Sequence, residues 1–504
     1  MKMATTTSTM LLSLLILAVA VINPTSAFVS KINTHASSLP STVQLSASSS
    51  DDDQGPYGLS RRQIGELTIA GIGLGGSFLA TREVTPQDYG LWGILPVGTY
   101  KQKKTLLEEI VPNTIWTLDQ KFGILNVQVP VRTTIIKLDG GGLFVYNPVA
   151  PTPECLSYIN DLVSKHGPVK HIVIGSVALE HKVYGSVLSQ KFPKAQVWIQ
   201  PGQYSFPVNL PSTFLGYPKN TKLIPQDPND APDDWKKSGL QYLTLGPFIS
   251  RDGAFGETVF YHQATKTLIC TDTVFEVNDK YEDIPKILLN DPTPIIYHAR
   301  NTVTDIIDPA DKRMLEQGYR RIVLFGLYFT PSGIVIKDVN TALAERRPDI
   351  NPDFAGIYPW DWIGNKDIES FNALKGGLVV APILQTLILN RNPIETLDFA
   401  DKVAKWDIKR IIPCHFNNNL TKYNGNDFRN AYKFLEASGV PNGLPKPLDS
   451  DIAFLRQSEV GLIESGAIAK CPPLPGTNKV TREQILKETV YNCRDNICAQ
   501  QSQP

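Results

Sequence analysis

Histidine is scarce in this sequence, with seven residues among 504. Because imidazole is a common metal ligand and proton carrier, a site that uses histidine must draw on few positions, and His181, His262, His298 and His415 are the informative ones. Cysteine is equally sparse, with six residues at scattered positions and no paired Cys-x-x-Cys spacing. This pattern excludes a disulfide scaffold and a structural zinc knuckle.

An excess of charge of one sign is also missing. Lys and Arg together number 49, as do Asp and Glu, so the chain lacks the basic footprint of a nucleic-acid-binding protein, and we expect no nucleic-acid partner. Beyond the leader, no stretch supplies the roughly 18 uninterrupted apolar residues of a membrane span. The nearest candidate, Gly376 to Leu389, is broken by Pro382 and Gln385. We therefore expect no transmembrane helix in the mature domain.

The first fifty residues are typical of a targeting sequence. Lys2 precedes an uncharged apolar run, Met10 to Ile22, which is too short to span a bilayer comfortably and is followed by small residues before Phe28. We interpret residues 1–27 as a signal peptide, and residues 28–50, rich in Ser and Thr and free of acidic residues, as a plastid transit peptide. This order resembles the bipartite presequence of algae with secondary plastids. Plain secretion with a disordered linker is the alternative.

Residues 51–86 form a linker with a second candidate address. Ser60-Arg61-Arg62 precedes the mildly apolar, glycine-rich run Leu67 to Ala80 and resembles a twin-arginine signal for the thylakoid lumen, although Glu66 interrupts it. An amphipathic helix packed on the domain, or a thylakoid surface anchor, is the alternative. We expect a plastid location, in the thylakoid lumen or at the thylakoid surface.

The main domain is expected over residues 87–470, before a tail of residues 471–504 in which Cys493 and Cys498 are either paired or free. Four runs of β-branched and aromatic residues predict an antiparallel meander: Thr114–Leu118, Ile124–Val129, Thr133–Leu138 and Leu143–Tyr146. Asp139-Gly140-Gly141-Gly142 supplies the positive-φ residues of a tight hairpin. A helix should follow, with Thr152 as N-cap, Pro153 at its first position and Gly167 as its stop.

Further along, polar residues follow the ends of expected strands. Glu180 and His181 come after the apolar strand Ile172–Ile174, in an expected loop before a helix over Lys182–Lys191. The remaining expected strands are Ala195–Ile199, the hairpin of Thr258–Tyr261 and Thr267–Cys270 that precedes Asp272, and Asp407–Pro413 that precedes His415. This is an α/β order, and in such folds ligands collect beyond the carboxyl ends of strands.

This pattern resembles the metallo-β-lactamase superfamily, whose signature is His-x-His-x-Asp-His and then a Gly, with a downstream His, an Asp after a hairpin and a final His after a strand. Here Ser176-Val177-Ala178-Leu179-Glu180-His181 occupies the signature, with Gly185 after it. Ser176 and Ala178 replace both leading histidines, and no histidine occurs between His181 and His262, where the third ligand of the first site should fall.

The resemblance therefore implies an αββα sandwich, two mixed sheets between helices, in which one metal site is erased and the other retained. The retained ligands match the second metal site of the superfamily, with Glu in place of Asp: Glu180, His181, Asp272 and His415. Several phrases are closer still to domain-of-unknown-function family 4336 of plants, algae and cyanobacteria: Leu179–Lys182, Phe192–Trp198, Pro201–Pro207 and Tyr297–Arg300. That likeness covers roughly residues 87 to 470 and implies the fold, since the family has no assigned chemistry.

Two imidazoles and two carboxylates suit one divalent Zn, Mn or Fe ion. Such an ion with an open position activates water near neutral pH, and Glu180 then either ligates the ion or orients the water as a base. The sequence thus predicts a mononuclear metal-dependent hydrolase of an ester, a thioester or a phosphoester, with an unknown small-molecule substrate.

The alternative is a degenerate relative that binds no metal and acts as a binding or assembly module in the plastid. His181, Asp272 and His415 would then serve as a helix-start histidine, a turn cap and a packed core histidine. Asn147 stands where the superfamily often keeps an Asp, which argues against a competent metal site. His298 and Arg300 either contact an anionic substrate or pair with a nearby carboxylate.

Overall fold

The structure is a computed structural model that describes residues 103–472 and 474, except for 125–126, 204–210, 214, 251–252, 352–355 and 465. The described residues belong to one compact unit, whose main segment begins at Thr99. The predicted signal peptide, transit peptide and linker lie outside the described residues, as do the expected domain start at residue 87 and most of the tail with Cys493 and Cys498.

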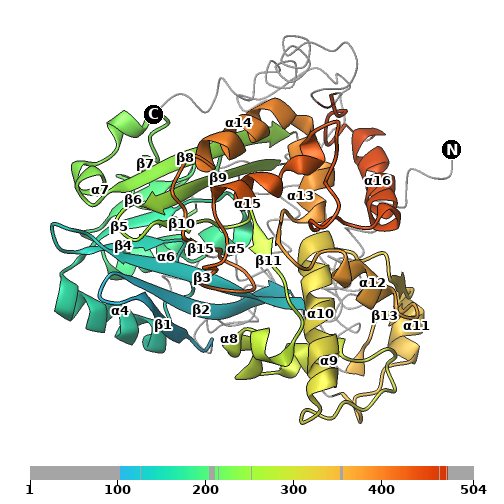
Figure 1. The fold of residues 1–504 in the computed structure, drawn as a ribbon. Helices are drawn as coiled ribbons and strands as arrows, with labels where there is room; N and C mark the ends of the chain where they lie inside the picture. The colour runs from blue at the N-terminus through green and yellow to red at the C-terminus, as the bar shows by residue number, and fades with distance from the viewer. Residues whose placement is uncertain are drawn as a thin grey trace, which may run out of the picture. The chain divides into compact units, whose positions relative to one another are not determined.

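A seven-stranded mixed sheet forms one layer (Figure 1). Its strands lie in chain order: β1 Leu106–Val111, β2 Ile115–Ile124, β3 Val127–Lys137, β4 Leu143–Tyr146, β5 Val169–Ile174, β6 Gln196–Ile199 and β7 Lys222–Leu223. The pairings are antiparallel from β1 to β4 and parallel from β4 to β7. Parallel neighbours need a crossover connection, which helix α4, Pro153–His166, supplies between β4 and β5.

Most of the opening elements agree with the prediction in type, and β4 and α4 also have the expected bounds. Gly141 and Gly142 have φ angles of 73° and 92° in the β3–β4 turn, as the hairpin required. Helix α4 begins at the Thr152 cap, whose side chain accepts a hydrogen bond from the Cys155 N–H, and ends at Gly167 with a φ of 97°. The expected strand Ile124–Val129 is wrong, because β2 ends at Ile124 and β3 begins at Val127.

A four-stranded mixed sheet forms the second layer, in the order β15-β10-β9-β8. Its strands are β8 Leu240–Ser250, β9 Gly253–His262, β10 Thr267–Ile269 and β15 Arg410–Ile412. The expected hairpin is confirmed by the antiparallel pair β9–β10, and β10 pairs with β15 in parallel. The space between the two sheets is filled by aromatic side chains, with the Trp235 ring centroid 5.3 Å from those of Phe144 and Phe260.

Helices cover the outer sides of both sheets. Helices α14, Pro393–Val403, and α15, Gly425–Asn430, bury apolar residues against the outer face of the four-stranded sheet. Helix α4 runs along the seven-stranded sheet in Figure 1, and helix α6, Gly185–Lys191, contacts β5. The αββα sandwich expected from the sequence is therefore confirmed.

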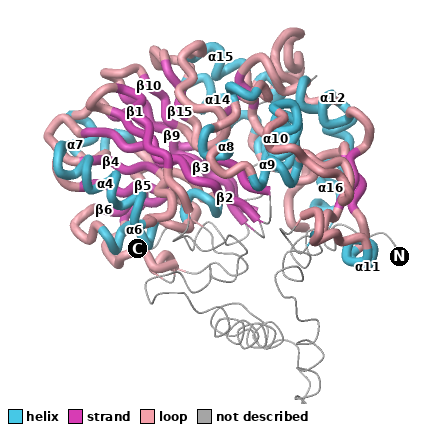
Figure 2. The backbone as a smooth tube through the Cα atoms, turned by 90° about the horizontal axis from the view of Figure 1, so that it is seen from below, coloured by secondary structure: helices cyan, strands magenta, loops and turns pink. Residues whose placement is uncertain are grey.

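A helical region lies beside the sheets, as Figure 2 shows for α9, α10 and α12. It is organised around α10, Lys312–Tyr328, which packs on a large apolar cluster and approaches α9 so closely that a Cβ on Gly318 would lie 2.0 Å from the Ile295 carbonyl oxygen.

The remaining elements are α5 Leu179–Lys182, α7 Asp233–Lys237, α8 Lys286–Leu289, α9 Thr293–His298, α11 Val339–Ala344, α12 Lys366–Asn372, α13 Pro382–Leu387, α16 Asp449–Glu464, β11 Phe275–Glu276, β12 Ile334–Ile336, β13 Trp360–Trp362, β14 Leu378–Val379, and the short 3₁₀ turns Pro228–Asp230, Tyr281–Asp283, Leu389–Arg391 and Lys433–Leu435. Within the part of the chain described, no helix has the length and apolarity needed to cross a membrane.

His171 on β5 ties the seven-stranded sheet to α7. Its Nδ1 accepts a hydrogen bond from Trp198 Nε1 at 3.0 Å, and its Nε2 lies 2.8 Å from Asp234 Oδ2. Only the neutral ring, with its proton on Nε2, makes both bonds, because a protonated Nδ1 has no lone pair for Trp198. Burial lowers the pKa of His171, and the bond to Asp234 offsets only part of that effect.

We expect His171 to contribute a fall in the free energy of unfolding as the pH drops below the ordinary histidine pKa of about 6.5. In this pH range His171 binds a proton in the unfolded chain but stays neutral in the folded protein. Lowering the pH therefore favours the unfolded state. Urea titrations at about pH 7.5 and about pH 5.5 measure this slope. The His171→Gln variant should show a smaller loss over the same interval, and an unchanged slope would contradict the assignment.

Candidate metal centre

Three strand ends deliver four polar side chains to one point. Glu180 and His181 lie on α5 beyond β5, Asp272 follows β10, and His415 follows β15. The expected loop for Glu180 and His181 is wrong, because both residues lie on the short helix α5. The expected helix over residues 182–191 is confirmed in type as α6, but α6 begins at Gly185, and Lys182 belongs to α5. The Ser176 Oγ accepts the Ala178 N–H at 3.1 Å just before α5.

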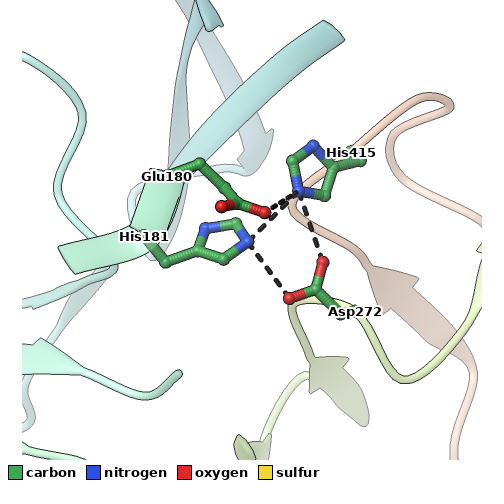
Figure 3. A group of neighbouring side chains, drawn as sticks. All are labelled: Glu180, His181, Asp272 and His415. Atoms are coloured by element: carbon green, nitrogen blue, oxygen red, sulfur yellow. Dashed lines mark hydrogen bonds and ion pairs between the residues drawn. The ribbon is translucent and has the colours of Figure 1, made fainter. Parts of the chain in front are cut away.

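The ligating atoms of the four residues face one another (Figure 3). His415 Nε2 lies 3.1 Å from His181 Nε2, 3.3 Å from Asp272 Oδ1 and 4.0 Å from Glu180 Oε1. His181 Nε2 lies 3.4 Å from Asp272 Oδ2. One atom from each residue lies within 4.8 Å of every other, and this is the one such group found among the described residues.

These separations fit a single small cation. Two atoms bound at about 2.0–2.1 Å to a tetrahedral zinc ion lie about 3.3 Å apart. The distances of 3.1, 3.3 and 3.4 Å among His181, Asp272 and His415 are close to that edge, whereas Glu180 stands further out at 4.0 Å. The nitrogen and carboxylate donors also suit Mn or Fe in the divalent state.

The His415 ring is held in the tautomer that a metal ligand needs. Its Nδ1 lies 2.7 Å from the Pro130 carbonyl oxygen. A carbonyl only accepts, so Nδ1 carries the hydrogen, and the lone pair of the neutral ring is on Nε2, which faces the group. Metal-binding histidines commonly have such a hydrogen bond on the other ring nitrogen.

The electrostatic environment of the four residues favours a bound positive charge. Burial lowers the pKa of His181, but the carboxylates of Asp272 and Glu180 outweigh it, and the net pKa lies above the ordinary value. Burial raises the pKa of Asp272, yet the two imidazoles outweigh it and hold that pKa well below the usual range. Both His181 and Asp272 therefore favour their charged forms. The group stabilises either a proton shared between the side chains or a metal cation in the place of that proton.

The positions of the two missing histidines serve backbone structure. Ser176 and Glu257 form an isolated antiparallel β-bridge, flanked by bonds from Thr258 N to Gly175 O at 2.7 Å and from Val177 N to Gly256 O at 3.2 Å. Ser176 is buried, and its hydroxyl is engaged by the N–H of Ala178. Strand pairing therefore runs through the place where the superfamily carries its first metal ligands.

The chain matches one known protein family. The family model for a domain of unknown function, DUF4336, matches residues 112–434 of the 504-residue chain. The chain belongs to the DUF4336 family. No curated protein matched the sequence.

Several solved structures are similar to this DUF4336 protein at low identity. A metallo-β-lactamase from Pontibacter korlensis is 14% identical, with a TM-score of 0.26, and the match covers 35% of this chain and 75% of that chain. A metallo-β-lactamase from Pseudomonas aeruginosa in its mono-zinc form is 13% identical, with a TM-score of 0.26 and coverages of 35% and 73%. A flavo di-iron protein variant from Thermotoga maritima is 13% identical, with a TM-score of 0.34 and coverages of 66% and 62%.

Asn147, at a position where the resemblance to the superfamily implies an Asp, links the segments of the candidate site. Its Oδ1 accepts the Gly175 N–H at 2.7 Å, at the exit of β5, and its Nδ2 lies 3.8 Å from Cys414 Sγ. Asn147 is buried and has a φ of 49°, a conformation that asparagine adopts more readily than most residues. The substitution thus keeps a hydrogen-bonded connection between the ends of β4, β5 and β15.

The structure places His298 and Arg300 apart from the group of four. His298 is buried at the end of α9, where its ring stacks on Trp360 with centroids 5.6 Å apart. Arg300 is buried as well, and its guanidinium donates to the Asp305 and Ile296 carbonyl oxygens at 3.2 Å. A role for them in binding an anionic substrate stays a prediction.

Sequence reasoning missed Glu257, which holds the turn that carries Asp272. Glu257 is fully buried on β9, and burial followed by the Asp272 charge raises its pKa to about 7. Its Oε1 accepts from Thr271 N at 2.6 Å and Thr273 Oγ1 at 3.1 Å, and its Oε2 accepts from Asp272 N at 2.8 Å. A lone charged residue inside an otherwise apolar strand was the available signal.

We expect Glu257→Gln to lower the free energy of unfolding by about 1–3 kcal/mol, because the amide nitrogen would face a backbone N–H that needs an acceptor. Urea denaturation at about pH 8, where the carboxylate is ionised, measures this loss. Thr273→Val is the matched control. It removes one of the three bonds and should cost about 1 kcal/mol. A Gln variant as stable as the wild type would show that Glu257 does not hold the turn.

Proposed function

We propose that this chain is a mononuclear metal-dependent hydrolase of the plastid, acting on a small-molecule ester, thioester or phosphoester. The observation that carries the proposal is the convergence of Glu180, His181, Asp272 and His415, from three segments far apart in the sequence, within 4.8 Å of one another. The locked tautomer of His415 supports it, because the hydrogen bond to Pro130 leaves Nε2 free to act as a ligand.

Three of the four residues form a largely buried set, whereas Glu180 is more exposed to solvent. The side chains of His181, His415 and Asp272 are 1%, 7% and 13% exposed, whereas that of Glu180 is 29% exposed. A divalent ion held there would supply a Lewis acid that makes water nucleophilic near neutral pH. The buried set would hold the ion, and Glu180, nearest to solvent and 4.0 Å from His415 Nε2, would accept the proton of the attacking water.

A non-catalytic binding or assembly module is the second candidate. The observation that favours it is the backbone bridge between Ser176 and Glu257, which occupies the place of the superfamily's first metal ligands. Hydrolases of the two-metal kind use both ions to stabilise the attacking and leaving oxygens, and among the described residues only one candidate set of ligands is found. Metal binding without hydrolysis would therefore favour this second candidate.

A plastid location forms part of the proposal and is supported by the leader sequence. Residues 1–27 have the pattern of a signal peptide and residues 28–50 that of a transit peptide. A fluorescent protein fused behind residues 1–86 should enter plastids of an alga with secondary plastids. The same fusion with residues 28–86 alone should stay outside them, and plastid entry of that shorter fusion would contradict the two-part reading of the leader.

The metal content of the purified protein tests the proposed function. We expect one Zn, Mn or Fe ion per chain at neutral pH, and its loss in His181→Ala and His415→Ala, because each variant removes a buried nitrogen ligand. His166→Ala is the control, since that ring lies at the end of α4 against Trp116. A wild-type protein that holds no ion after mixing with each metal would sink the proposal.

The same preparations distinguish the two candidates. Nitrophenyl acetate, a thioester and a nitrophenyl phosphodiester serve as probes of the three bond classes. A hydrolase should cleave one of them in the metal-loaded form, lose the activity with chelator, and slow by about 100-fold or more in Glu180→Gln, which retains the shape of the side chain without its basicity. Stoichiometric metal with no cleavage in any class would support the binding module instead.

A further inference from the structure

Strand β3 contacts both the ring of His415 and the backbone around it. The Pro130 carbonyl oxygen accepts the Nδ1 hydrogen of the His415 ring, as described above. Two residues further along β3, the side chain of Arg132 reaches the backbone on both sides of the same histidine. Its Nη1 donates to Pro413 O at 2.5 Å, and its Nη2 donates to Phe416 O at 3.3 Å. Ring and backbone of His415 are therefore fixed from one strand.

Arg132 is itself locked in place by Asp119 on β2. Arg132 Nε donates to Asp119 Oδ1 at 2.7 Å, and Nη2 donates to Asp119 Oδ2 at 2.6 Å. This two-point contact sets the plane of the guanidinium as well as its position. Both side chains are almost fully buried, and a buried ion pair is a poor source of net stability compared with apolar packing. A role in placing the groups that it contacts accounts better for the pair.

The backbone that Arg132 contacts has an uncommon conformation. Phe416 has a φ of 52°, in the left-handed region that a bulky residue seldom adopts. The Phe416 carbonyl is one of the two that accept from the guanidinium. The hydrogen bond thus offsets the strain of a turn that the residue alone would not take, and this turn directs the chain away immediately after His415.

We propose that Arg132 is the positioning residue of the metal centre, which presets His415 Nε2 opposite His181 and Asp272 by holding the two carbonyls that flank His415. The inference rests on the proposed metal binding and goes beyond it, because it assigns the affinity of the site to a residue that does not contact the ion. A merely structural Arg132 would affect the stability of the fold and leave the affinity for metal unchanged.

A matched residue exists elsewhere in the chain. Arg321 on α10 is also almost fully buried, pairs with Asp367 at 3.0 Å, and donates through Nη1 to the carbonyl oxygens of His298 at 3.2 Å and Arg300 at 2.7 Å. It therefore has the same chemistry as Arg132, a buried ion pair that binds backbone carbonyls. None of its recorded hydrogen bonds or ion pairs involves the four residues of the metal centre.

The surroundings of Arg132 allow the fold to survive its replacement. Asp119, Arg132 and Phe416 line a cavity of about 370 Å³ together with Asn417 and Lys422. Water in that space can hydrate carbonyls that lose a guanidinium bond. In Arg132→Lys the ammonium keeps the charge opposite Asp119, but it lacks the planar fork that reaches two separate carbonyls.

Titration of the full chain with Co(II), followed by visible absorption, tests the proposal. Wild type, Arg132→Lys and Arg321→Lys are compared, with urea denaturation of each to record stability. We expect Arg132→Lys to bind Co(II) about 10- to 100-fold more weakly, the usual effect of losing a group that orients a ligand, with an altered absorption spectrum. Arg321→Lys should lose stability and bind with the affinity and spectrum of the wild type.

The outcomes separate the inference from the proposed function. A wild type that binds no Co(II) overturns the metal function, and the inference with it. A wild type that binds, together with an Arg132→Lys that binds equally well or an Arg321→Lys that is equally impaired, overturns the inference alone. If Arg132→Lys does not fold, Asp119→Asn replaces it. That variant keeps the guanidinium but loosens its hold, and weaker Co(II) binding than in Arg321→Lys supports the inference, whereas unchanged binding overturns it.

Discussion

The parallel pairing of β10 with β15 is the contact on which the candidate site depends. The register places Ile269 opposite Ile412, and the Cys270 N–H continues the ladder to the Ile412 carbonyl at 3.1 Å. Asp272 and His415 follow these strands by three residues each, so the pairing brings them to the same edge of the sheet, although more than a hundred residues separate them. A slip of one residue would send alternate side chains to the opposite face and separate the two ligands.

A second junction brings α5 over that edge. Bonds from Thr258 N to Gly175 O and from Val177 N to Gly256 O join the end of β5 to β9 of the other sheet. Tyr146 adds a hydrogen bond to the Thr258 carbonyl at 2.8 Å, and a Cβ on Gly175 would lie within 2.6 Å of the Tyr146 hydroxyl oxygen. Glycine at this position therefore leaves room for the Tyr146 ring, whose hydroxyl reaches β9 of the other sheet. In the stretch that resembles the superfamily signature, the first half therefore forms a sheet-to-sheet junction, and the second half carries Glu180 and His181 of the candidate site.

How far the sequence predicts this structure depends on the range of the interactions. Helix α4 was predicted with its caps because Thr152 and Gly167 act on neighbouring backbone groups. The four site residues were found because each follows a short apolar strand, a local pattern. Glu257 and Arg132 were missed because their partners are distant, 281 residues along the chain in the case of Arg132 and Pro413. The division of residues 179–191 into α5 and α6 was also missed, because tertiary packing, such as that of α6 on β5, overrides the local pattern.

The way in which the residues of the site are held also helps to distinguish a metal centre from a group of side chains that only packs in the core. His415 is held by Pro130 and Arg132, and Asp272 by Glu257 through backbone N–H groups, so these two residues are held by contacts outside the group of four as well as within it. Two imidazole Nε2 atoms 3.1 Å apart next to carboxylates are costly to bury unless a cation or proton lies between them. A fold that had lost any use for the group could remove this cost with an apolar side chain at either histidine. The folded chain instead holds the donor atoms close together. This is expected for a metal site whose ligands are already in position before an ion binds.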